Sequence, residues 1–430
     1  MAATVMLILP TATYRATAFL RAADRLGLRV VVASEEAPTL AALIPERMLT
    51  LDLGRPEQAA ATAADFAART AVDAVVGVDE SAVLTAAGVA ARLGRRHSPV
   101  EAVAATRDKR RLRARLAAAG VSQPRFVEIA ADPEGGVPES AVAAVGFPCV
   151  VKPVDLAASR GVIRADDPVS LRAAVARVDA LLRSPDLCGG EAAPLLLEAF
   201  VAGPEVAVEG LIDGGRLQVL AIFDKPDPLD GPYFEETLLI TPSRHAAAAV
   251  DAVVATTARA VVALGLTDGP IHAELRLGGG GPVLIEVAAR SIGGLCSGAL
   301  RFVEADAPHS ALSLEDLILR QALGMPLGRP RLDPPAAGAL MLPILQAGTL
   351  RDVTGVDEAR RVPGVVDVAI SIPRGRPVVP LPEGDRYLGF VLARGDSPAA
   401  VETSLRRAGE LVRADVAPPL GAAVSAPASE

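Results

Sequence analysis

The sequence predicts an α/β fold with α+β parts, opening on a Rossmann-like parallel-sheet domain. Three observations predict it. Residues 1–96 alternate short apolar strands with helices, the βαβ pattern of a parallel sheet covered on both faces. Residues 271–290 carry two alternating strands around a glycine turn, which is typical of a hairpin. After a Pro/Gly-rich linker at 324–335, short strands and a helix at 398–413 form a small α+β unit.

The composition limits the classes to which the chain can belong. Its 430 residues suggest about two to four domains, and an apolar share of 51% allows large cores. A net charge of -8, few aromatics and no basic block argue against a nucleic-acid partner. We expect no membrane segment, because apolar stretches such as residues 5–10 have strand length, and a cytoplasmic location, because no leader pattern is present. Cys149, Cys188 and Cys296 fit no metal or disulfide spacing.

The first 96 residues are expected to form strands at 5–9, 29–33, 48–51 and 74–78, with helices at 15–26, 56–69 and 80–93. The turn after the first strand, PTATYRA, lacks the GxGxxG fingerprint, which disfavours a NAD-binding enzyme. Asp79 and Glu80 follow the fourth strand at the carboxyl edge, where ligands bind in α/β sheets. Helix capping by Asp79 is the equal alternative.

Lysine is scarce in this chain. Of 43 basic residues only Lys109, Lys152 and Lys225 are lysine. An ammonium is a compact point charge and a guanidinium a planar fork, so the two are not interchangeable. These positions therefore indicate sites that need an ammonium group, with chance retention as the alternative. Lys109 lies in the first turn of a helix predicted at 106–119, Lys152 ends a buried strand, and Lys225 lies in a loop at 224–232 rich in Pro and Asp.

The hairpin carries the clearest chemistry. Pairing its strands about Gly280 places Glu274 opposite Glu286, on one face with His272 and Arg290. Opposed carboxylates repel, so a hard cation such as Mg2+ is expected between them, and Arg290 could meet an anion. A solvated surface hairpin is the alternative. The other face is apolar and consists of Ile271, Ala273, Leu275, Val283, Ile285 and Val287.

Several stretches in this order resemble the ATP-grasp superfamily: Lys109 opening its helix, VVKP, a small-residue loop ending in SRGV, LLLEAFVAGPEVAVEG and HAE…IEVAAR. FDKPDPLDGPYFEETLLITPS and ARSIGGLCSGALRF, with the C-terminal unit, resemble the L-amino acid ligase type of carboxylate–amine ligase. The resemblance covers residues 1–415. It implies an N-terminal domain at 1–96, an ATP-grasp domain at 97–326 and a ligase-associated domain at 327–416, followed by a disordered tail at 417–430.

The resemblance also implies a role for each matched position. Arg290 would stabilise the tetrahedral intermediate, and Lys152, Ser159 and Gly161 would act in phosphoryl transfer. Two Mg2+ ions, with Mn2+ as the alternative, would bind Glu274 and Glu286. The nucleotide would contact Lys109, Lys152, Glu198, Ala199, Val201, Glu205 and Lys225.

Substrate contacts are predicted with open alternatives. Glu235 or Glu236 could bind a substrate ammonium, or lie on a solvated strand face. Arg301 could bind a substrate carboxylate, or form a surface salt bridge. Gly293 and Gly294 would let the backbone approach the acyl phosphate. His272 is expected to make a structural hydrogen bond.

The chain departs from the family pattern at two places. Relatives carry Gly and Ser where this phosphate loop has Ala157 and Ala158, and alanine resists positive φ. Many relatives also have Asn where this chain has Ala288, although the amino acid ligase branch often lacks it.

The predicted activity is ATP-dependent joining of a carboxylate, such as an amino acid, to an amine through an acyl phosphate, with release of ADP and phosphate. One alternative is a carboxylase or purine-type ligase of the same superfamily. Another, favoured by the two alanines, is a degenerate ATP-binding module without turnover. The expected partners are a small-molecule acid and amine, and a homodimer is an open alternative to a monomer.

Overall fold

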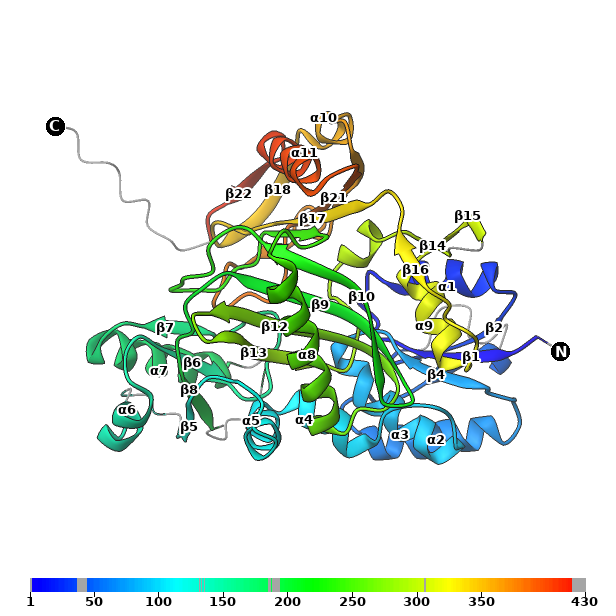
Figure 1. The fold of residues 1–430 in the computed structure, drawn as a ribbon, viewed down its shortest axis with the longest axis horizontal. Helices are drawn as coiled ribbons and strands as arrows, with labels where there is room; N and C mark the ends of the chain where they lie inside the picture. Colours follow the sequence, from blue (N-terminus) through cyan, green and yellow to red (C-terminus); the bar gives the residue numbers. More distant parts are fainter. Residues whose placement is uncertain are drawn as a thin grey trace.

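A computed structural model of the chain describes residues 2–36, 45–130, 132, 134, 136–184, 187, 194–304 and 307–419. Cys188 and the part of the predicted tail after residue 419 lie outside these residues. The α/β class with α+β parts is confirmed, because the N-terminal sheet is parallel and the other main sheets are antiparallel. Figure 1 shows the parallel-sheet domain at the right, a small lobe at the lower left and the C-terminal domain at the top.

The N-terminal strands form a parallel sheet of order β3-β2-β1-β4. Their bounds lie within a residue of the prediction: β1 (Thr4–Ile8), β2 (Arg29–Ser34), β3 (Met48–Thr50) and β4 (Ala74–Gly77). Val5 and Leu7 pack with α1 (Ala16–Arg25) and α9 (Leu314–Ala322), whereas Met6 and Ile8 pack with α2 (Pro56–Ala67) and α3 (Val83–Leu93). Because successive side chains of β1 point to opposite faces of the sheet, this one apolar strand contributes to two cores.

Two short helices lead from this domain to the small lobe. The helix predicted at 106–119 is α5 (Lys109–Ala118), and α4 (Val100–Arg107) is not predicted by the sequence pattern. The Asp108 side chain accepts from the backbone N–H groups of Arg110 and Arg111, so it caps α5 and makes Lys109 its first residue.

The small lobe is an antiparallel sheet of order β5-β8-β6-β7. Its elements are β5 (Phe126–Ile129), α6 (Glu139–Val145), β6 (Cys149–Pro153), β7 (Ile163–Ala165), α7 (Pro168–Leu182) and β8 (Leu195–Ala199). The phosphate loop, residues 155–162, joins β6 to β7 and is held at both ends by this sheet.

The largest sheet has eight antiparallel strands in the order β13-β12-β9-β10-β11-β17-β21-β19. Their bounds are β9 (Glu205–Asp213), β10 (Arg216–Lys225), β11 (Leu238–Thr241), β12 (Gly269–Gly278), β13 (Gly281–Ala288), β17 (Ala336–Leu342), β19 (Val365–Ile370) and β21 (Gly389–Gly395). Because β11 pairs with β17, the sheet crosses the boundary predicted at 327. The domain limits themselves stay predictions.

The remaining elements surround this sheet. They are η1 (Pro45–Arg47), η2 (Glu80–Ala82), α8 (Ala247–Leu264), η3 (Cys296–Ala299), β14 (Phe302–Glu304), β15 (Ala307–Leu312), β16 (Pro330–Leu332), β18 (Gly348–Thr354), α10 (Val356–Arg360), β20 (Pro377–Val378), α11 (Pro398–Leu411) and β22 (Arg413–Ala417). Within the described ranges, α8 is the helix whose length and composition would allow it to cross a membrane. It lays its buried side chains, such as Val253 and Val261, against the sheet.

The hairpin has the predicted register at its chemical centre and a different one near its turn. Glu274 lies opposite Glu286 and His272 opposite Ala288, as predicted. Beyond Glu274 a bulge shifts the pairing, so that Leu275 faces Leu284. Leu284 is therefore the buried core residue, whereas Ile285, expected on the apolar face, lines a cavity.

Candidate active site

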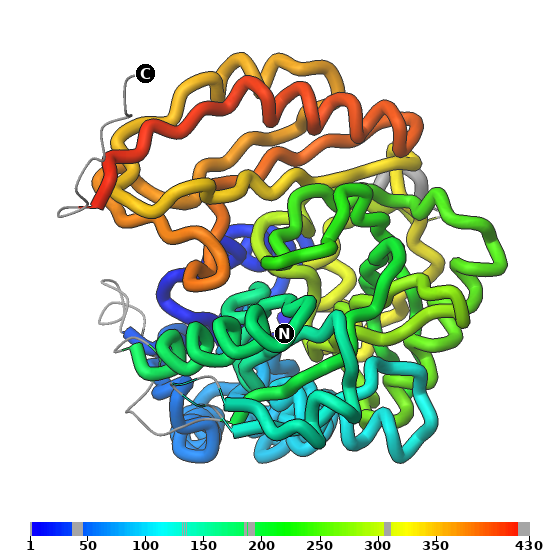
Figure 2. The backbone as a smooth tube through the Cα atoms, turned by 90° about the vertical axis from the view of Figure 1, so that its left-hand side faces the viewer, coloured from blue at the N-terminus to red at the C-terminus, as the bar shows by residue number. Residues whose placement is uncertain are grey.

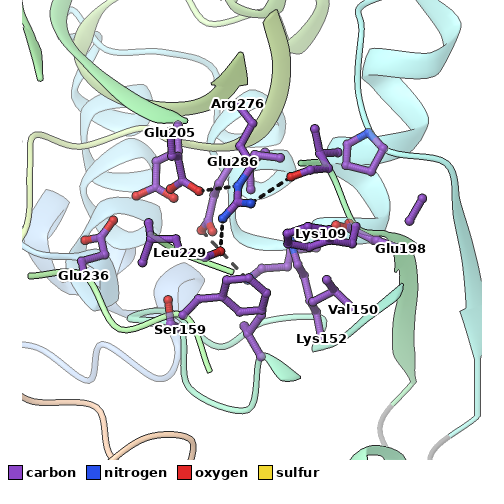
Figure 3. A pocket seen from close by; sticks show the side chains of 18 of the residues that line it. Lys109, Val150, Lys152, Ser159, Glu198, Glu205, Leu229, Glu236, Arg276 and Glu286 are labelled. Atoms are coloured by element: carbon purple, nitrogen blue, oxygen red, sulfur yellow. Dashed lines mark hydrogen bonds and ion pairs between the residues drawn. The ribbon is translucent and has the colours of Figure 1, made fainter. Parts of the chain in front are cut away.

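Two adjoining cavities lie where the domains meet. The first lies between the small lobe and the hairpin (Figure 3). The second is lined by residues of the N-terminal domain, the large sheet and the C-terminal domain. The two cavities adjoin, because they share lining residues. These are Ala157, Ser159, Glu236, Glu274 and Glu286.

Lys152 is held at the side of the first cavity by a buried carboxylate. Its Nζ lies 2.8 Å from Oε2 of Glu198, and the Arg113 guanidinium binds the same carboxylate at 2.7 and 3.2 Å. Burial by itself would raise the pKa of Glu198, but the charges of Arg113 and Lys152 outweigh it and lower the pKa to about 2. Glu198 therefore stays ionised and fixes the position of Lys152.

Lys109 faces the cavity from the first turn of α5. Its Nζ donates to the carbonyl oxygen of Leu156 at 2.6 Å and lies 4.0 Å from Oε1 of Glu286. The backbone N–H of Lys109 also donates to the carbonyl oxygen of Val154. The two predicted phosphate lysines thus flank the start of the phosphate loop.

Lys225 is enclosed by carboxylates. Its Nζ contacts Glu205 at 2.6 Å, Glu274 at 3.1 Å and Glu236. Burial would lower the pKa of Lys225, but these three carboxylates hold it well above its ordinary value. Burial raises the pKa of Glu236 to about 7 against the opposing charge of Lys225. Lys225 orders three acidic side chains and does not line the first cavity.

Arg276 joins Glu205, which the resemblance assigns to the nucleotide, to the segment at the end of β8, residues 199–201, called the hinge below. Its guanidinium donates to Glu205 at 2.9 Å, to the carbonyl oxygen of Val201 at 2.8 Å and to that of Leu229 (Figure 3). It also lies over the Phe200 ring, 5.0 Å from the centroid. One cation therefore fixes the carboxylate and the hinge backbone that line the same cavity.

The carboxylates between the cavities fit a hard divalent cation. Glu274 and Glu286 extend from paired strands into the shared space with 20% and 35% of their side chains exposed. Carboxylate oxygens are the ligands that Mg2+ prefers. In the described part of the chain, Glu205, Glu236 and Glu274 also offer ligand atoms within 4.8 Å of one another, around Lys225.

The phosphate loop adopts left-handed backbone without glycine at its centre. Ala158 has φ 56° and Ser159 has φ 54°. This conformation costs a non-glycine residue about 1–2 kcal/mol, so contacts elsewhere must hold the loop. Gly161 has φ 72°, and a Cβ there would lie 2.7 Å from Cγ of Pro153. Alanine at positions 157 and 158 therefore does not prevent the loop from forming, since Ala158 takes a backbone conformation that glycine usually supplies.

One side of the second cavity is charged. Arg290 is paired with Glu80, whose side chain also contacts Arg107 at 3.1 Å. Burial opposes ionisation of Glu80, but Arg290 and Arg107 lower its pKa. Glu80 is thus an ion-pair partner, and Asp79 makes no capping hydrogen bond.

His272 makes the structural hydrogen bond expected of it. Its Nδ1 lies 3.1 Å from Glu209, a fully buried carboxylate that also accepts from the backbone N–H of Ile292. Burial would lower the pKa of His272, but Glu209 and Glu274 raise it to about 9.

The second cavity also has apolar lining residues, and Gly293 and Gly294 belong to its lining as well. Gly294 has φ 59°, and the Phe390 ring lies where its Cβ would be, so only glycine fits there. The apolar lining residues are Leu239, Ile292, Cys296, Met341, Tyr387 and Phe390.

Two predicted substrate residues are not brought into the site. Arg301 binds Asp333 at 2.9 Å and lines neither cavity, which favours the salt-bridge alternative. Glu235 also lines neither, whereas Glu236 lines both, because adjacent residues of an extended segment point to opposite sides.

Three buried residues of the site are missed by the sequence reasoning: Arg113, Arg276 and Glu209. Arg276 follows Glu274 by two positions, so strand alternation places it on the face of His272 and Glu274. Arg113 lies four residues after Lys109, on the same side of α5. These spacings could have identified both arginines. Glu209 follows Glu205 by four positions in β9, so strand alternation places it on the same face as Glu205.

Comparisons with known proteins agree with this geometry. Residues 20–94 match the ATP-grasp N-terminal domain, 145–299 the ATP-grasp domain, and 340–417 the L-amino acid ligase C-terminal domain 2. The chain is 30% identical to alanine–anticapsin ligase of Bacillus subtilis over 52% of its length, and 32% identical to dapdiamide A synthase of Enterobacter agglomerans over 34%. It spans only 49% and 34% of the lengths of these two relatives.

A solved structure extends the likeness to nearly the whole chain. The L-amino acid ligase from Bacillus licheniformis superposes with a TM-score of 0.78 and 27% identity, covering 96% of this chain and 99% of that one. Along the chain the matched regions occur in the order N-terminal domain, ATP-grasp domain and C-terminal domain. The chain belongs to the ATP-grasp superfamily and carries a C-terminal domain of the L-amino acid ligase type.

Proposed function

We propose that the protein is an ATP-dependent carboxylate–amine ligase acting on an amino acid. One observation carries the proposal. The cavity lined by Lys109 and Lys152 shares Ser159, Glu274 and Glu286 with a second cavity beside it. A γ-phosphate at the inner end of the first cavity would therefore face a carboxylate bound in the second.

The first cavity has the parts that a nucleotide needs. The hinge at 199–201 offers backbone groups to adenine, and Glu205, fixed by Arg276 and Lys225, would accept from the ribose hydroxyls. Lys109 and Lys152 lie at the phosphate end, where two ammonium groups would offset the negative charge. Mg2+ bound by Glu274 and Glu286 would supply further charge neutralisation at the phosphates.

The reaction then follows from the order of the groups. A carboxylate oxygen of the acid attacks the γ-phosphorus, and the bond to the bridging oxygen breaks, which leaves ADP and an acyl phosphate. The amine nitrogen attacks the acyl carbon, loses a proton, and phosphate departs with the electrons of the C–O bond. Arg290, which lines the second cavity, would stabilise the oxyanion of the tetrahedral intermediate. This oxyanion exists after the amine has attacked and before phosphate departs.

The side chains that line the second cavity limit the class of acid that it can bind. Arg290 in the lining suits the carboxylate of an amino acid, and the same lining offers the apolar side chains of Leu239, Met341 and Phe390. We propose an amino acid with an apolar side chain as the acyl donor, because burying that chain against these residues is favourable. The amine, a cytoplasmic location and a homodimer stay predictions.

Phosphate release from ATP in the presence of Mg2+ and pooled amino acids tests the proposal. Glu286→Gln should abolish the amino-acid-dependent release, and Glu101→Gln, at an exposed position, should leave it unchanged. Pools of apolar amino acids should support the fastest release. If ATP binds and no pool stimulates release, the degenerate ATP-binding module replaces the ligase proposal.

A further inference from the structure

A loop of the C-terminal domain docks on the phosphate loop. This segment, residues 380–387, precedes β21 and contacts the two residues that follow the left-handed Ser159. The backbone N–H of Gly161 donates to the carbonyl oxygen of Pro382 at 2.8 Å. The Arg160 Nε donates to the carbonyl oxygen of Glu383, also at 2.8 Å. Figure 2 shows the orange segment of the C-terminal domain reaching down towards the small lobe.

An ion pair ties the same loop to α7 of the small lobe. Arg177 binds both carboxylate oxygens of Glu383, at 2.7 and 3.0 Å. Its guanidinium also lies 5.2 Å from the centroid of the Tyr233 ring and contacts the Tyr233 hydroxyl. Tyr233 in turn forms a bridge with Ile163, the residue that begins β7. Glu383 is therefore linked to the phosphate loop through Arg160, and to the start of β7 through Arg177 and Tyr233.

The 380–387 loop also reaches the second cavity. Asp385, Arg386 and Tyr387 line that cavity together with Ala158 and Ser159. The loop thus touches the phosphate loop on one side and the space assigned to the acid on the other. Since Ala158 and Ser159 resist the left-handed backbone that they adopt, the contacts at Arg160 and Gly161 are placed to hold them there.

We propose that the 380–387 loop holds the phosphate loop in its closed conformation, with Glu383 and Arg160 as positioning residues for ATP. Neither would need to touch the nucleotide. The inference rests on the proposed function, because it places the triphosphate beside residues 157–161. If the loop is closed for a smaller fraction of the time, the apparent affinity for ATP falls by that fraction.

Charge reversal at Glu383 tests the contact. Glu383→Arg replaces attraction to Arg177 with repulsion at a half-exposed site, where an ion pair is worth at most about fivefold. We expect KM for ATP to rise about three- to fivefold with kcat changed less than about twofold. The double variant Glu383→Arg/Arg177→Glu restores the pair and should return KM to within about twofold of the wild type.

A control variant and a second measurement separate this loop contact from general damage. Asp333→Arg reverses a similarly exposed ion pair, with Arg301, that lies away from both cavities, and it should change nothing. Limited trypsin digestion reports the loop directly, because Arg160 lies within it and its side chain is only 13% exposed. Cleavage after Arg160 should accelerate in Glu383→Arg and return to the wild-type rate in the double variant.

The outcomes are distinct. Unchanged cleavage after Arg160, equal loosening by Asp333→Arg, or failure of the double variant to restore the wild-type rate would each overturn the inference. If no acid supports turnover, ATP binding by calorimetry and the trypsin rates still decide it, so its failure is distinguishable from failure of the ligase proposal.

Discussion

Glu198→Gln should destabilise the protein by about 3 kcal/mol at pH 7. Glu198 is 1% exposed and binds Arg113 and Lys152. Its pKa falls from an ordinary 4.5 to about 2, and each unit corresponds to about 1.4 kcal/mol, so ionisation contributes about 3 kcal/mol. Glutamine resembles the protonated acid and loses that contribution. Urea denaturation followed by far-UV circular dichroism measures it, since the chain has no tryptophan.

The pH dependence gives the sharper test. Because folding lowers the pKa of Glu198, the stabilisation is complete above about pH 4.5 and is lost as the pH falls towards 2. The difference between wild type and Glu198→Gln should shrink to about 1.5 kcal/mol at pH 3. Glu101→Gln, whose side chain is 77% exposed, should change stability by less than about 0.5 kcal/mol. A cost below about 1 kcal/mol at pH 7, or one that is equal at pH 3 and 7, would refute the reasoning.

Three further predictions follow from the same contacts. Gly161→Ala should weaken ATP binding about tenfold by calorimetry, because its Cβ would lie 2.7 Å from Pro153 at φ 72°; equal affinity would contradict the proposed loop geometry. Lys225→Met should lower the free energy of unfolding by about 3–5 kcal/mol, because three carboxylates lose their counter-charge. The loss is measured as a lower Tm, and an unchanged Tm would show that these carboxylates are hydrated. Cys149 and Cys296 should resist iodoacetamide at pH 8 in the native state, since burial raises their pKa values to about 11 and 12; rapid labelling by mass spectrometry would show that these thiols are accessible.

The pairing of Glu274 with Glu286 could be predicted because it depends on local sequence. A glycine turn between two alternating strands restricts the register to a few choices, and opposing the two carboxylates selects one. The bulge before Glu286 could not be predicted in this way. Arg113 donates to the carbonyl oxygens of Leu284 and Ile285, so a residue of α5 supports the shifted backbone. Alternation within one strand carries no information about that distant partner.

The continuous eight-stranded sheet could not be predicted from the sequence, for the same physical reason. Leu238 to Thr241 and Ala337 to Leu340 are two short, mostly apolar runs about a hundred residues apart. Their pairing places Leu239 and Ala339 in one core and Leu238 and Ile240 in another. Propensity and periodicity are local properties, whereas pairing is decided by what else each strand can cover. The predicted Pro/Gly-rich linker at 324–335 contains β16, and the large sheet includes strands from both sides of it.

The scarcity of lysine gains a physical explanation from the site. Lys109 and Lys152 present ammonium groups to the first cavity, and Lys225 fits among three carboxylates that a guanidinium would have to push apart. Arginine occupies the positions that join separate elements. Arg113 bridges a carboxylate and two carbonyls, and Arg276 bridges a carboxylate, the hinge and the 224–232 loop. A planar fork with five donors suits such bridging, whereas a compact ammonium suits a phosphate that arrives and leaves. Lys109 and Lys152 therefore face the ligand of the first cavity, whereas Lys225, like Arg113 and Arg276, holds the residues that shape this cavity.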